Sequence, residues 1–584
     1  MKSLLHYISA MEQSGELVRI RTFVDPVLEI AEVADRVAKS AGGGKALLFE
    51  NTGTAFPVAV NLYGSPSRMR RALGVASYDD VERSLTALFA GLLQPKSTLW
   101  DKLKLLPVLK QAAQWAPKIV GGRGACQQVV MPQPDLSKLP ALQCWPYDGG
   151  RFITLPAVHT KDPATGARNV GMYRMQVMSN NTTGMHWHRH KTGARHFAAF
   201  AAQHPDGGHF PVAVALGGDP VYAYCATAPM PDNLDEYLLA GFLRRRPVEL
   251  VRCLTQPLEV PTDADVVIEG YIDTRDPLVV EGPFGDHTGF YSLEDRYPLL
   301  HVTCITHRRQ AVYPATVVGV PPQEDACMTQ ATERIFLTPI RLVIAPEIVD
   351  IHMPVEGVAH NLAIVKIKKE YPGQALKVAH GLWGAGQMMF NKIMIVVDGE
   401  TPLTDYPALL RRLSRHYAPA TDTCFSYGPL DVLDHAATTP AMGGKLCIDA
   451  TQPVSEPESN RRNERGDSRL LACIHKGDPI PRARIVAMFD RQVDTDDFAT
   501  CLWLLGNNID VARDCRLEHG QLVIDATAKP AQIAPRRWPN IICAHAATIA
   551  AVDAKWSQLG LGDLIVSPSL RYRRLSQGEA AARD

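Results

Sequence analysis

The sequence predicts a multidomain α/β protein in which a β-rich barrel or sandwich lies between two α/β domains. Its 584 residues exceed what one hydrophobic core normally holds, and at roughly 100 to 200 residues per domain they predict about three or four domains. Helix-period and strand-period segments alternate towards both ends of the chain, whereas short strands broken by Pro and Gly dominate the middle. These two observations predict the order of the domains.

The N-terminal α/β domain is predicted over residues 1–126. A helix near 3–14, the strand ELVRI, the helix PVLEIAEVADRVAKSA and the Gly-rich turn and strand GGGKALLFEN follow one another, which is typical of α/β structure. The stretch LWDKLKLLPVLKQAAQWAPKIVGGRGA has the pattern of helices on a long connection. We therefore expect a helical insertion near 99–125.

The central β-rich domain is predicted over residues 127–315. Its strand signals are ACQQVVM, FPVAVALGG, DVVIEGYI and LLHVTCITH, separated by Pro and Gly, which favours a barrel or sandwich. One helix, PDNLDEYLLAGFLRRR, stands among them, with Asp232 as the expected N-cap and an apolar face that includes Tyr237 and Phe242.

The C-terminal α/β domain is predicted over residues 316–584. Strands such as LAIVKIKK and NKIMIVVDGE alternate with helices such as PGQALKVAHGLWG, and apolar strands of this kind pack on both faces. Residues 452–468 have the polar composition of a surface loop, and the last stretch, LSQGEAAARD, is predicted to be a frayed tail.

Composition and charge exclude several function classes. The 61 Lys and Arg balance the 61 Asp and Glu, so the chain has no basic excess that would attract nucleic acid. The N-terminus lacks a signal-peptide pattern, and no apolar run approaches the roughly 20 residues of a membrane span. Twelve cysteines occur without a CxxC pair, which indicates reduced thiols. We expect a soluble, cytoplasmic protein.

Two segments of the β-rich region carry candidate functional residues. In NVGMYRMQV, Asn169, Tyr173 and Arg174 lie on a predicted strand, where an Arg is more often a surface or salt-bridging residue than a functional one. In MHWHRHKTGARHF, alternating histidines point to one face of a strand and could share a metal. The alternatives are a cleft for an anionic ligand and a polar strand face. The three histidines are His186, His188 and His190.

Two acids flank a tight turn in VVEGPFGDHTGFY. Glu281 and Asp286 stand on either side of Gly-Pro-Phe-Gly, a combination that lets the chain reverse direction. Taken alone the stretch is a corner. Glu236 in the predicted helix and Lys392 at a strand start are, taken alone, ordinary surface charges.

The order of these motifs decides between the interpretations. The succession of N-x-G-x-Y-R, DEYLLAGFLR, EGPFGDHTGFY and NKIMIVVD resembles the UbiD family of reversible, prenylated-FMN-dependent decarboxylases of aromatic and α,β-unsaturated acids. The resemblance covers most of the chain. It implies an N-terminal α/β domain, a central split β-barrel like that of flavin reductases, and a C-terminal α/β domain that forms a dimer.

The resemblance also implies a cofactor site. Asn169 and Glu236 match ligands of a divalent metal, usually manganese, which bridges to the flavin phosphate; a hard cation prefers such oxygen donors. Among the three histidines, His190 ranks first as the further ligand. A potassium ion is an additional candidate. Residues that match cofactor contacts are Met172, Tyr173, Arg174, His188, His190, Lys191, Thr192 and, at the phosphate, Lys392.

The catalytic set implied by the resemblance is Arg174, Glu281 and Asp286. In the family a covalent bond between the substrate and the modified flavin supplies the electron sink that side chains lack, and an acid then protonates the product carbon. Asp286 is the expected proton donor. A donor must be protonated, so we expect a raised pKa for Asp286, while Arg174 keeps Glu281 ionised. His287 could join this network, although a hydrogen-bonded turn residue is the role we expect first.

The predicted function is therefore decarboxylation of an aromatic acid, either a hydroxybenzoate or a quinone precursor, with release of CO2. A separate flavin prenyltransferase would make the cofactor, and a homodimer or higher homo-oligomer is expected. Two other classes remain open from the residues alone. One is a zinc hydrolase built on His186, His188 and His190; the other is a non-catalytic protein that binds flavin or phosphate.

Overall fold

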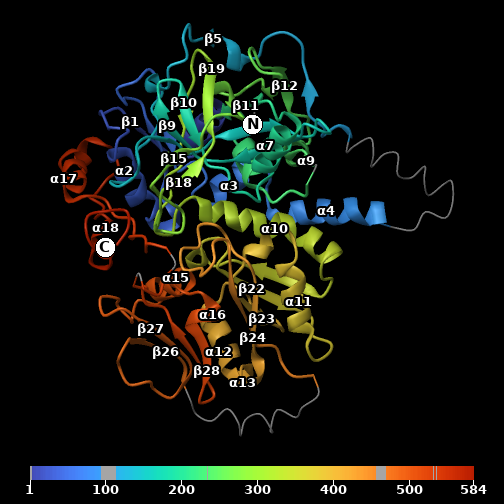
Figure 1. Cartoon of the computed structure of the whole chain (residues 1–584), viewed down its shortest axis with the longest axis vertical. Helices are drawn as coiled ribbons and strands as arrows, with labels where there is room; N and C mark the ends of the chain where they lie inside the picture. Colours follow the sequence, from blue (N-terminus) through green and yellow to red (C-terminus); the bar gives the residue numbers. More distant parts are fainter. Residues whose placement is uncertain are drawn as a thin grey trace, which may run out of the picture. The chain divides into compact units, whose positions relative to one another are not determined.

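A computed structural model describes residues 3–93, 113–232, 234–454, 469–530, 532–534 and 536–583. Most of the predicted insertion near 99–125 and most of the predicted loop 452–468 lie outside these residues. The chain forms two compact units, Met1–Met328 with Ile542–Arg573, and Thr329–Ile541 with Arg574–Asp584 (Figure 1). The predicted α/β fold around a central split barrel is confirmed by the sheets described below.

The N-terminal region is a small mixed sheet with helices. Strands β1 and β2 are parallel, β2 and β3 antiparallel, and β3 pairs in parallel with β20, which follows the central region in the chain. Ser3 caps α1, because its hydroxyl accepts the N–H of His6 at 3.3 Å. The elements are α1 (Leu4–Gln13), β1 (Leu17–Ile20), α2 (Glu29–Ala38), β2 (Ala46–Phe49), β3 (Val58–Val60), α3 (Pro66–Leu73), α4 (Tyr78–Leu93) and β20 (Tyr313–Pro314).

The central region is one nine-stranded sheet in which every pair is antiparallel. The order is β6-β9-β10-β19-β14-β11-β7-β8, with β5 beside β19, so the sheet is open between β6 and β8 as in a split barrel. Its strands are β5 (Val129–Val130), β6 (Phe152–Ile153), β7 (Ala157–Lys161), β8 (Arg168–Met172), β9 (Met175–Ser179), β10 (Thr182–Met185), β11 (His209–Leu216), β14 (Val266–Asp273) and β19 (Leu299–His307).

Helices and short hairpins carry the polar residues beside this sheet. The cap of α9 is Asp235, whose carboxylate accepts the N–H of Tyr237 at 2.9 Å. The predicted cap, Asp232, instead pairs with Arg195 at 2.5 Å. The elements are α7 (Thr192–Gln203), α8 (Val221–Thr227), α9 (Glu236–Arg244), β4 (Lys118–Ile119), β12 (Glu249–Arg252), β13 (Glu259–Pro261), β15 (Val279–Glu281), β16 (Phe284–Gly285), β17 (Tyr291–Ser292) and β18 (Asp295–Tyr297).

The second unit contains two sheets, β21-β22-β23-β25-β24 and β26-β27-β29-β28. Every residue of β22 is buried, as expected for a parallel strand covered on both faces. The strands are β21 (Ile348–His352), β22 (Leu362–Ile367), β23 (Ile393–Val397), β24 (Thr423–Pro429), β25 (Met442–Asp449), β26 (Arg469–His475), β27 (Ala483–Phe489), β28 (Cys515–Glu518) and β29 (Gln521–Asp525). The helices are α10 (Asp325–Val343), which begins in the first unit, α11 (Gln374–Trp383), α12 (Tyr406–His416), α13 (Pro419–Asp422), α15 (Phe498–Asn508) and α16 (Val511–Asp514).

Residues 542–573 return to the first unit, although the sequence analysis assigned them to a C-terminal domain. They include α17 (Ala546–Lys555) and α18 (Ser569–Tyr572). Buried Arg36 of α2 explains the return, because its guanidinium donates to Asp553 at 2.6 Å and to the carbonyl of Ile565 at 3.0 Å. The frayed tail is also wrong for the described residues, since Asn540 donates to the carbonyls of Gln577 and Ala580.

Candidate active site

The acid-bearing stretch connects β15 to the hairpin of β16 and β17, whose turn runs from Asp286 to Gly289, where the N–H of Gly289 donates to the carbonyl of Asp286 at 3.0 Å. Glu281 is the last residue of β15 and is fully buried. Gly282 has a φ of +96°, a conformation that favours glycine, and a Cβ on Gly285 would lie 2.3 Å from the Trp145 ring. The path of the chain from Glu281 to Asp286 therefore depends on these two glycines. The expected turn at Gly-Pro-Phe-Gly is displaced, because Phe284 and Gly285 pair with β17 as strand β16 and the turn begins only at Asp286.

Arg174, between β8 and β9, contacts both acids. Its Nε donates to Glu281 Oε1 at 2.8 Å and its Nη2 to Oε2 at 3.0 Å, a two-point ion pair. Its Nη1 donates to Asp286 Oδ2. The guanidinium also lies over the Phe284 ring, 4.6 Å from its centre. One turn thus surrounds the arginine with two carboxylates and an aromatic face.

The charges of this cluster set the acids below their usual pKa values. Burial alone would raise the pKa of Glu281, but Arg174 and His186 hold it at about 2. Burial would also raise the pKa of Asp286, but the hydrogen bond from His287 and the Arg174 charge hold it well below its usual range. The expected raised pKa of Asp286 is therefore wrong for this arrangement, because Arg174 serves both acids and not Glu281 alone.

Backbone contacts fix the turn against its neighbours. Gln176 on β9 accepts the N–H of Gly282 at 2.7 Å and donates to the carbonyl of Gly149 at 2.7 Å. The N–H of Gly149 donates to the carbonyl of Pro283 at 2.7 Å. Sequence analysis did not find Gln176; the available signal was its spacing of two from Arg174, which places both side chains on one side of an extended chain.

His186 is a further member of the cluster. Its Nδ1 lies 2.9 Å from Glu281 Oε2, and its Nε2 lies 2.6 Å from Nε2 of His188. Burial and the Arg174 charge lower the pKa of His186, which keeps the ring neutral. Because an ionised carboxylate only accepts, Nδ1 of His186 donates to Glu281, and the ring Nε2 accepts from His188.

Asn169 and Glu236, the two predicted oxygen ligands, lie together. Glu236 begins α9, and its Oε2 accepts the N–H of Val170, the residue after Asn169, at 2.8 Å. Both side chains are buried, and burial raises the pKa of Glu236 to about 8. A buried carboxylate of this kind gains from a neighbouring cation, and a side-chain amide adds a second oxygen donor. The residues present therefore fit a hard divalent metal.

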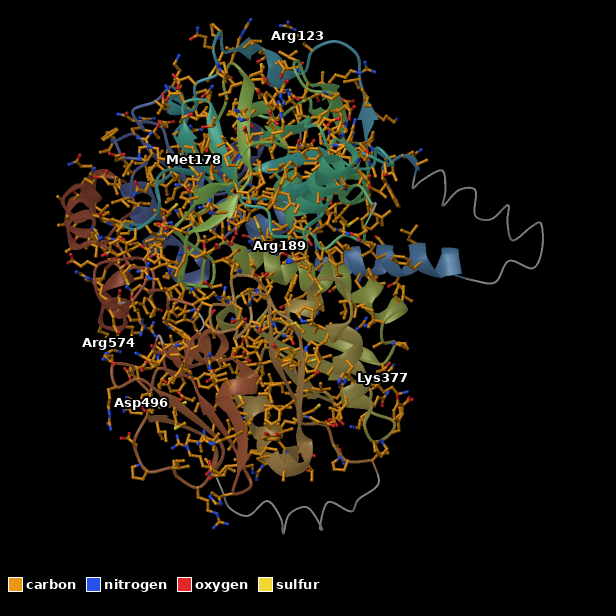
Figure 2. The ribbon with its side chains drawn as sticks, in the orientation of Figure 1. Arg123, Met178, Arg189, Lys377, Asp496 and Arg574 are labelled. Atoms are coloured by element: carbon orange, nitrogen blue, oxygen red, sulfur yellow. The ribbon has the colours of Figure 1, made fainter. Side chains whose placement is uncertain are left out.

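The predicted cofactor contacts cluster near the start of α7. The Tyr173 hydroxyl accepts the N–H of Gly193 at 3.4 Å, which brings the strand of Met172 to the helix that begins at Thr192. The N–H of Lys191 donates to the carbonyl of His188 at 2.9 Å. Arg189, which follows His188, is labelled in Figure 2. A helix N-terminus beside a lysine suits a phosphate group.

His190 is placed by its ring contact with His188, whose centre lies 5.8 Å away. The structure thus joins Val170, the neighbour of Asn169, to Glu236 and His186 to Glu281, and it places His190 next to His188. Within the described part of the chain, no group of three or more His, Cys, Asp or Glu side chains is arranged to hold a metal ion. The described residues therefore give no support to the alternative of a zinc site shared by His186, His188 and His190.

Lys392 belongs to the second unit, where it is fully buried. Its Nζ contacts Asp434 at 2.6 Å and donates to the carbonyls of Gly506 at 2.8 Å and Ile509 at 2.9 Å. An ammonium group has three N–H donors, and these three partners use them all. A role at the cofactor phosphate stays a prediction for this residue.

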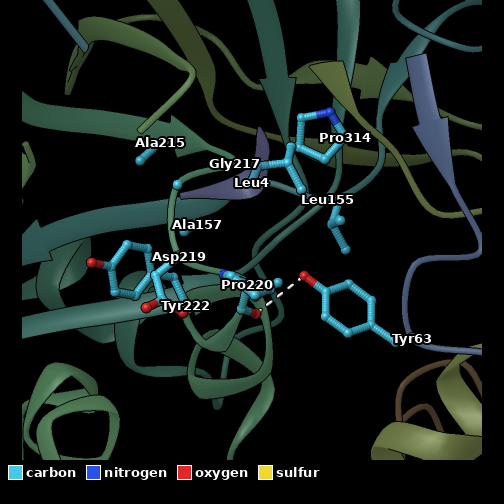
Figure 3. A pocket seen from close by; sticks show the side chains of 12 residues that line it. Leu4, Tyr63, Leu155, Ala157, Ala215, Gly217, Asp219, Pro220, Tyr222 and Pro314 are labelled. Carbon is cyan, nitrogen blue, oxygen red and sulfur yellow. Dashed lines mark hydrogen bonds between the residues drawn. The ribbon is translucent and has the colours of Figure 1, made fainter. Parts of the chain in front are cut away.

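A small cavity lies apart from this cluster, between α8 and the N-terminal region (Figure 3). Its volume of about 10 Å³ has room for about one water molecule. Tyr63 donates to the carbonyl of Pro220 at 3.1 Å at its wall. Among the described residues, no predicted site side chain lines this cavity.

No described helix is long and apolar enough to cross a membrane.

Three family models match successive parts of this chain. They describe the N-terminal, Rift-related and C-terminal domains of 3-octaprenyl-4-hydroxybenzoate carboxy-lyase. In this chain they match residues 8–88, 118–321 and 326–450, respectively. The chain belongs to the UbiD family. This UbiD-family protein is thus a member of a family of carboxy-lyases, as the order of its motifs predicted.

Relatives and solved structures agree with this membership. An uncharacterized protein of Aquifex aeolicus is 45% identical over 84% of this chain and 98% of its own length, and one of Archaeoglobus fulgidus is 48% identical over 77% and 92%. The UbiD-class enzyme HmfF from Pelotomaculum thermopropionicum, in complex with FMN, matches with a TM-score of 0.65 and 27% identity over 78% of this chain and 95% of that one.

Two further structures share the fold. An evolved dimeric form of HmfF in complex with prFMN matches with a TM-score of 0.63 and 27% identity over 78% of this chain and 96% of that one. The closed form of the Sedimentibacter hydroxybenzoicus vanillic acid decarboxylase matches with a TM-score of 0.66 and 26% identity over 78% and 94%.

Proposed function

We propose that this UbiD-family protein is a non-oxidative, reversible decarboxylase of an aromatic carboxylic acid, a hydroxybenzoate-like acid or a quinone precursor. The observation that carries the proposal is the buried cluster of Arg174 with Glu281 and Asp286, which combines a cation with two acids of which one can pass on a proton. The vanillic acid decarboxylase among the structural neighbours supports an aromatic substrate.

Arg174 binds the carboxylate of the substrate and orients it. Arginine carries five N–H donors, and three of them serve Glu281 and Asp286. The other two are available to a substrate carboxylate, which the guanidinium would fix beside the acids. Burial of the cluster keeps water from competing for these contacts, which strengthens the electrostatic attraction between Arg174 and a substrate carboxylate.

Glu281 and Asp286 have different roles in proton transfer. Glu281, held ionised by Arg174 and by the Nδ1 proton of His186, stays an acceptor and fixes the arginine. Asp286 is the residue that hands a proton to the carbon which loses CO2. Prenylated FMN, when bound, supplies the electron sink that no ordinary side chain offers. FMN and prFMN in the two HmfF structures support this cofactor.

In this proposal the cofactor is held by Asn169, Met172, Tyr173, Arg174, His188, His190, Lys191 and Thr192, and the phosphate role of Lys392 stays a separate prediction. Asn169, Glu236 and His190 hold manganese, and potassium is a further cation of the site. A separate flavin prenyltransferase supplies the flavin, and the protein works as a cytoplasmic homodimer. The evolved dimeric form of HmfF supports the dimer.

The test is co-expression with a flavin prenyltransferase, identification of the bound flavin by mass spectrometry and a screen of aryl acids for CO2 release. We expect prenylated FMN and release from at least one acid. Asp286→Asn should bind the flavin yet lose turnover, by about 10²-fold or more if it is the general acid. An unchanged rate in that variant contradicts the assignment of Asp286.

A further inference from the structure

The proton that ends on the product is not stored on Asp286 in the resting site. Decarboxylation of a carboxylate to a C–H bond consumes one proton in each turnover. Arg174 and His287 both contact the Asp286 carboxylate and favour its ionised form. If Asp286 hands over the proton, as proposed above, another group must first supply it.

His287 is placed to supply that proton. Its Nδ1 lies 3.0 Å from Asp286 Oδ1, and its backbone N–H donates to the same oxygen at 2.8 Å. Since an ionised carboxylate only accepts, Nδ1 of His287 carries the hydrogen. The His287 side chain is 24% exposed, whereas that of Asp286 is 11% exposed. The imidazole therefore links the acid to the solvent side of the turn.

Charged groups from several elements surround His287. Asp286 contacts the ring directly. Burial raises the pKa of the Asp325 carboxyl at the start of α10, and the His287 charge opposes that rise. Arg174 also contacts Asp286, and Lys39 acts on Asp325 in the same direction as His287. Two acids thus face the imidazole from two different elements.

We propose that His287 is the proton relay of this site, passing a proton from solvent to Asp286. The Nδ1–H bond of the imidazolium breaks as an Oδ1–H bond forms on Asp286. That O–H bond then breaks as a C–H bond forms at the carbon that has lost CO2, using the electron pair left by the broken C–C bond. Asp286 returns to its carboxylate, and neutral His287 regains a proton from water.

The first test needs neither cofactor nor substrate. In protein labelled with ¹⁵N-histidine, the variant His287→Asn removes one of the 19 histidine signals and so assigns it. We expect Asp286→Asn to lower the pKa of His287 by about one unit, because the variant removes the adjacent negative charge. An unchanged His287 titration in that variant would overturn the relay.

The second test measures turnover of the holoenzyme. In His287→Asn the side-chain amide keeps a donor at the Nδ1 position but cannot transfer a proton. We expect kcat to fall by about 10²-fold with KM close to that of the wild type. The control His301→Asn removes another histidine that contacts an acid, Asp276 at 2.5 Å, and should leave kcat unchanged. An unchanged kcat in His287→Asn contradicts the relay.

The two tests separate this inference from the proposed function. A wild-type holoenzyme that releases CO2 from no aryl acid contradicts the proposed function, and the cofactor-free titration still decides whether His287 and Asp286 share a proton. If the holoenzyme releases CO2 and His287→Asn does not change its kcat, the proposed function is supported and the relay is contradicted.

Discussion

Asp148 accepts a hydrogen bond from the backbone N–H of Gly285, the residue before Asp286, at 2.7 Å. Its other oxygen accepts the N–H groups of Cys144 at 3.0 Å and Trp145 at 2.8 Å. One buried carboxylate therefore ties two loops together immediately next to the acid of the site. The position of Asp286 depends on this contact as well as on Arg174.

We expect Asp148→Asn to weaken both loops. An amide has one accepting oxygen, so at least one of the three N–H groups loses its partner, at a cost of about 1–3 kcal/mol in unfolding free energy. Displacement of Asp286 should also lower kcat. Chemical denaturation and CO2 release measure the two effects. The exposed residue Asp206 provides the control, Asp206→Asn, and equal behaviour of the two variants contradicts the prediction.

Arg174→Lys should release the two acids from their shared cation. A lysine ammonium cannot reproduce the two-point contact with Glu281 and the contact with Asp286 together, so the pKa of both acids should rise. Turnover should fall by about 10²-fold or more. Infrared difference spectra of protonated carboxyls and CO2 release check this. Arg195→Lys, in an exposed pair with Asp232, is the matched control.

The ionised Glu281 predicts a particular loss of stability in acid. Its folded pKa of about 2 lies below the unfolded value, so its contribution is present above about pH 4.3 and disappears as the pH falls towards 2. We expect Glu281→Gln to flatten the dependence of unfolding free energy on pH in that window, by roughly 3 kcal/mol at 1.36 kcal/mol per pKa unit. Equal slopes for variant and wild type would exclude it.

Glu236→Gln should weaken manganese binding. The variant keeps the size of the side chain but removes the charge beside Asn169, so we expect at least about 10-fold lower affinity. Manganese titration followed by electron paramagnetic resonance measures it. Asp232→Asn removes an exposed carboxylate and should bind the metal like the wild type. Equal affinities in Glu236→Gln and Asp232→Asn would show that Glu236 is not a ligand.

Lys392→Met should destabilise the second unit. The change leaves Asp434 charged and buried without its cation, which costs about 3–5 kcal/mol. Adding Asp434→Asn should recover part of the loss. Thermal unfolding compares these variants with Lys377→Met, a change at a side chain that is 47% exposed and pairs with Glu347. Lys377 is labelled in Figure 2. Weaker flavin binding at unchanged stability would instead favour the phosphate role.

Local patterns in the sequence predicted the fold class and many of the candidate residues. Strand and helix periods are properties of short stretches, so they identified the central sheet. The trio of Arg174, Glu281 and Asp286 was instead implied by the resemblance of the ordered motifs to the UbiD family. Side-chain chemistry then indicated what each residue type can do.

Only the tertiary structure decided how these residues act together. Arg174 meets Glu281 across 107 residues of chain and Asp286 across 112, and no local pattern encodes which acids share one guanidinium. That sharing, together with the hydrogen bond from His287, lowers the pKa of Asp286, whereas the sequence predicted a raised pKa. Because Asp286 is then ionised, the proton must come from another group, and His287 contacts its carboxylate. The contacts of Asp148 and the return of residues 542–573 to the first unit could not be predicted from the sequence either. The free energy of such contacts depends on distances that are set only when the chain folds.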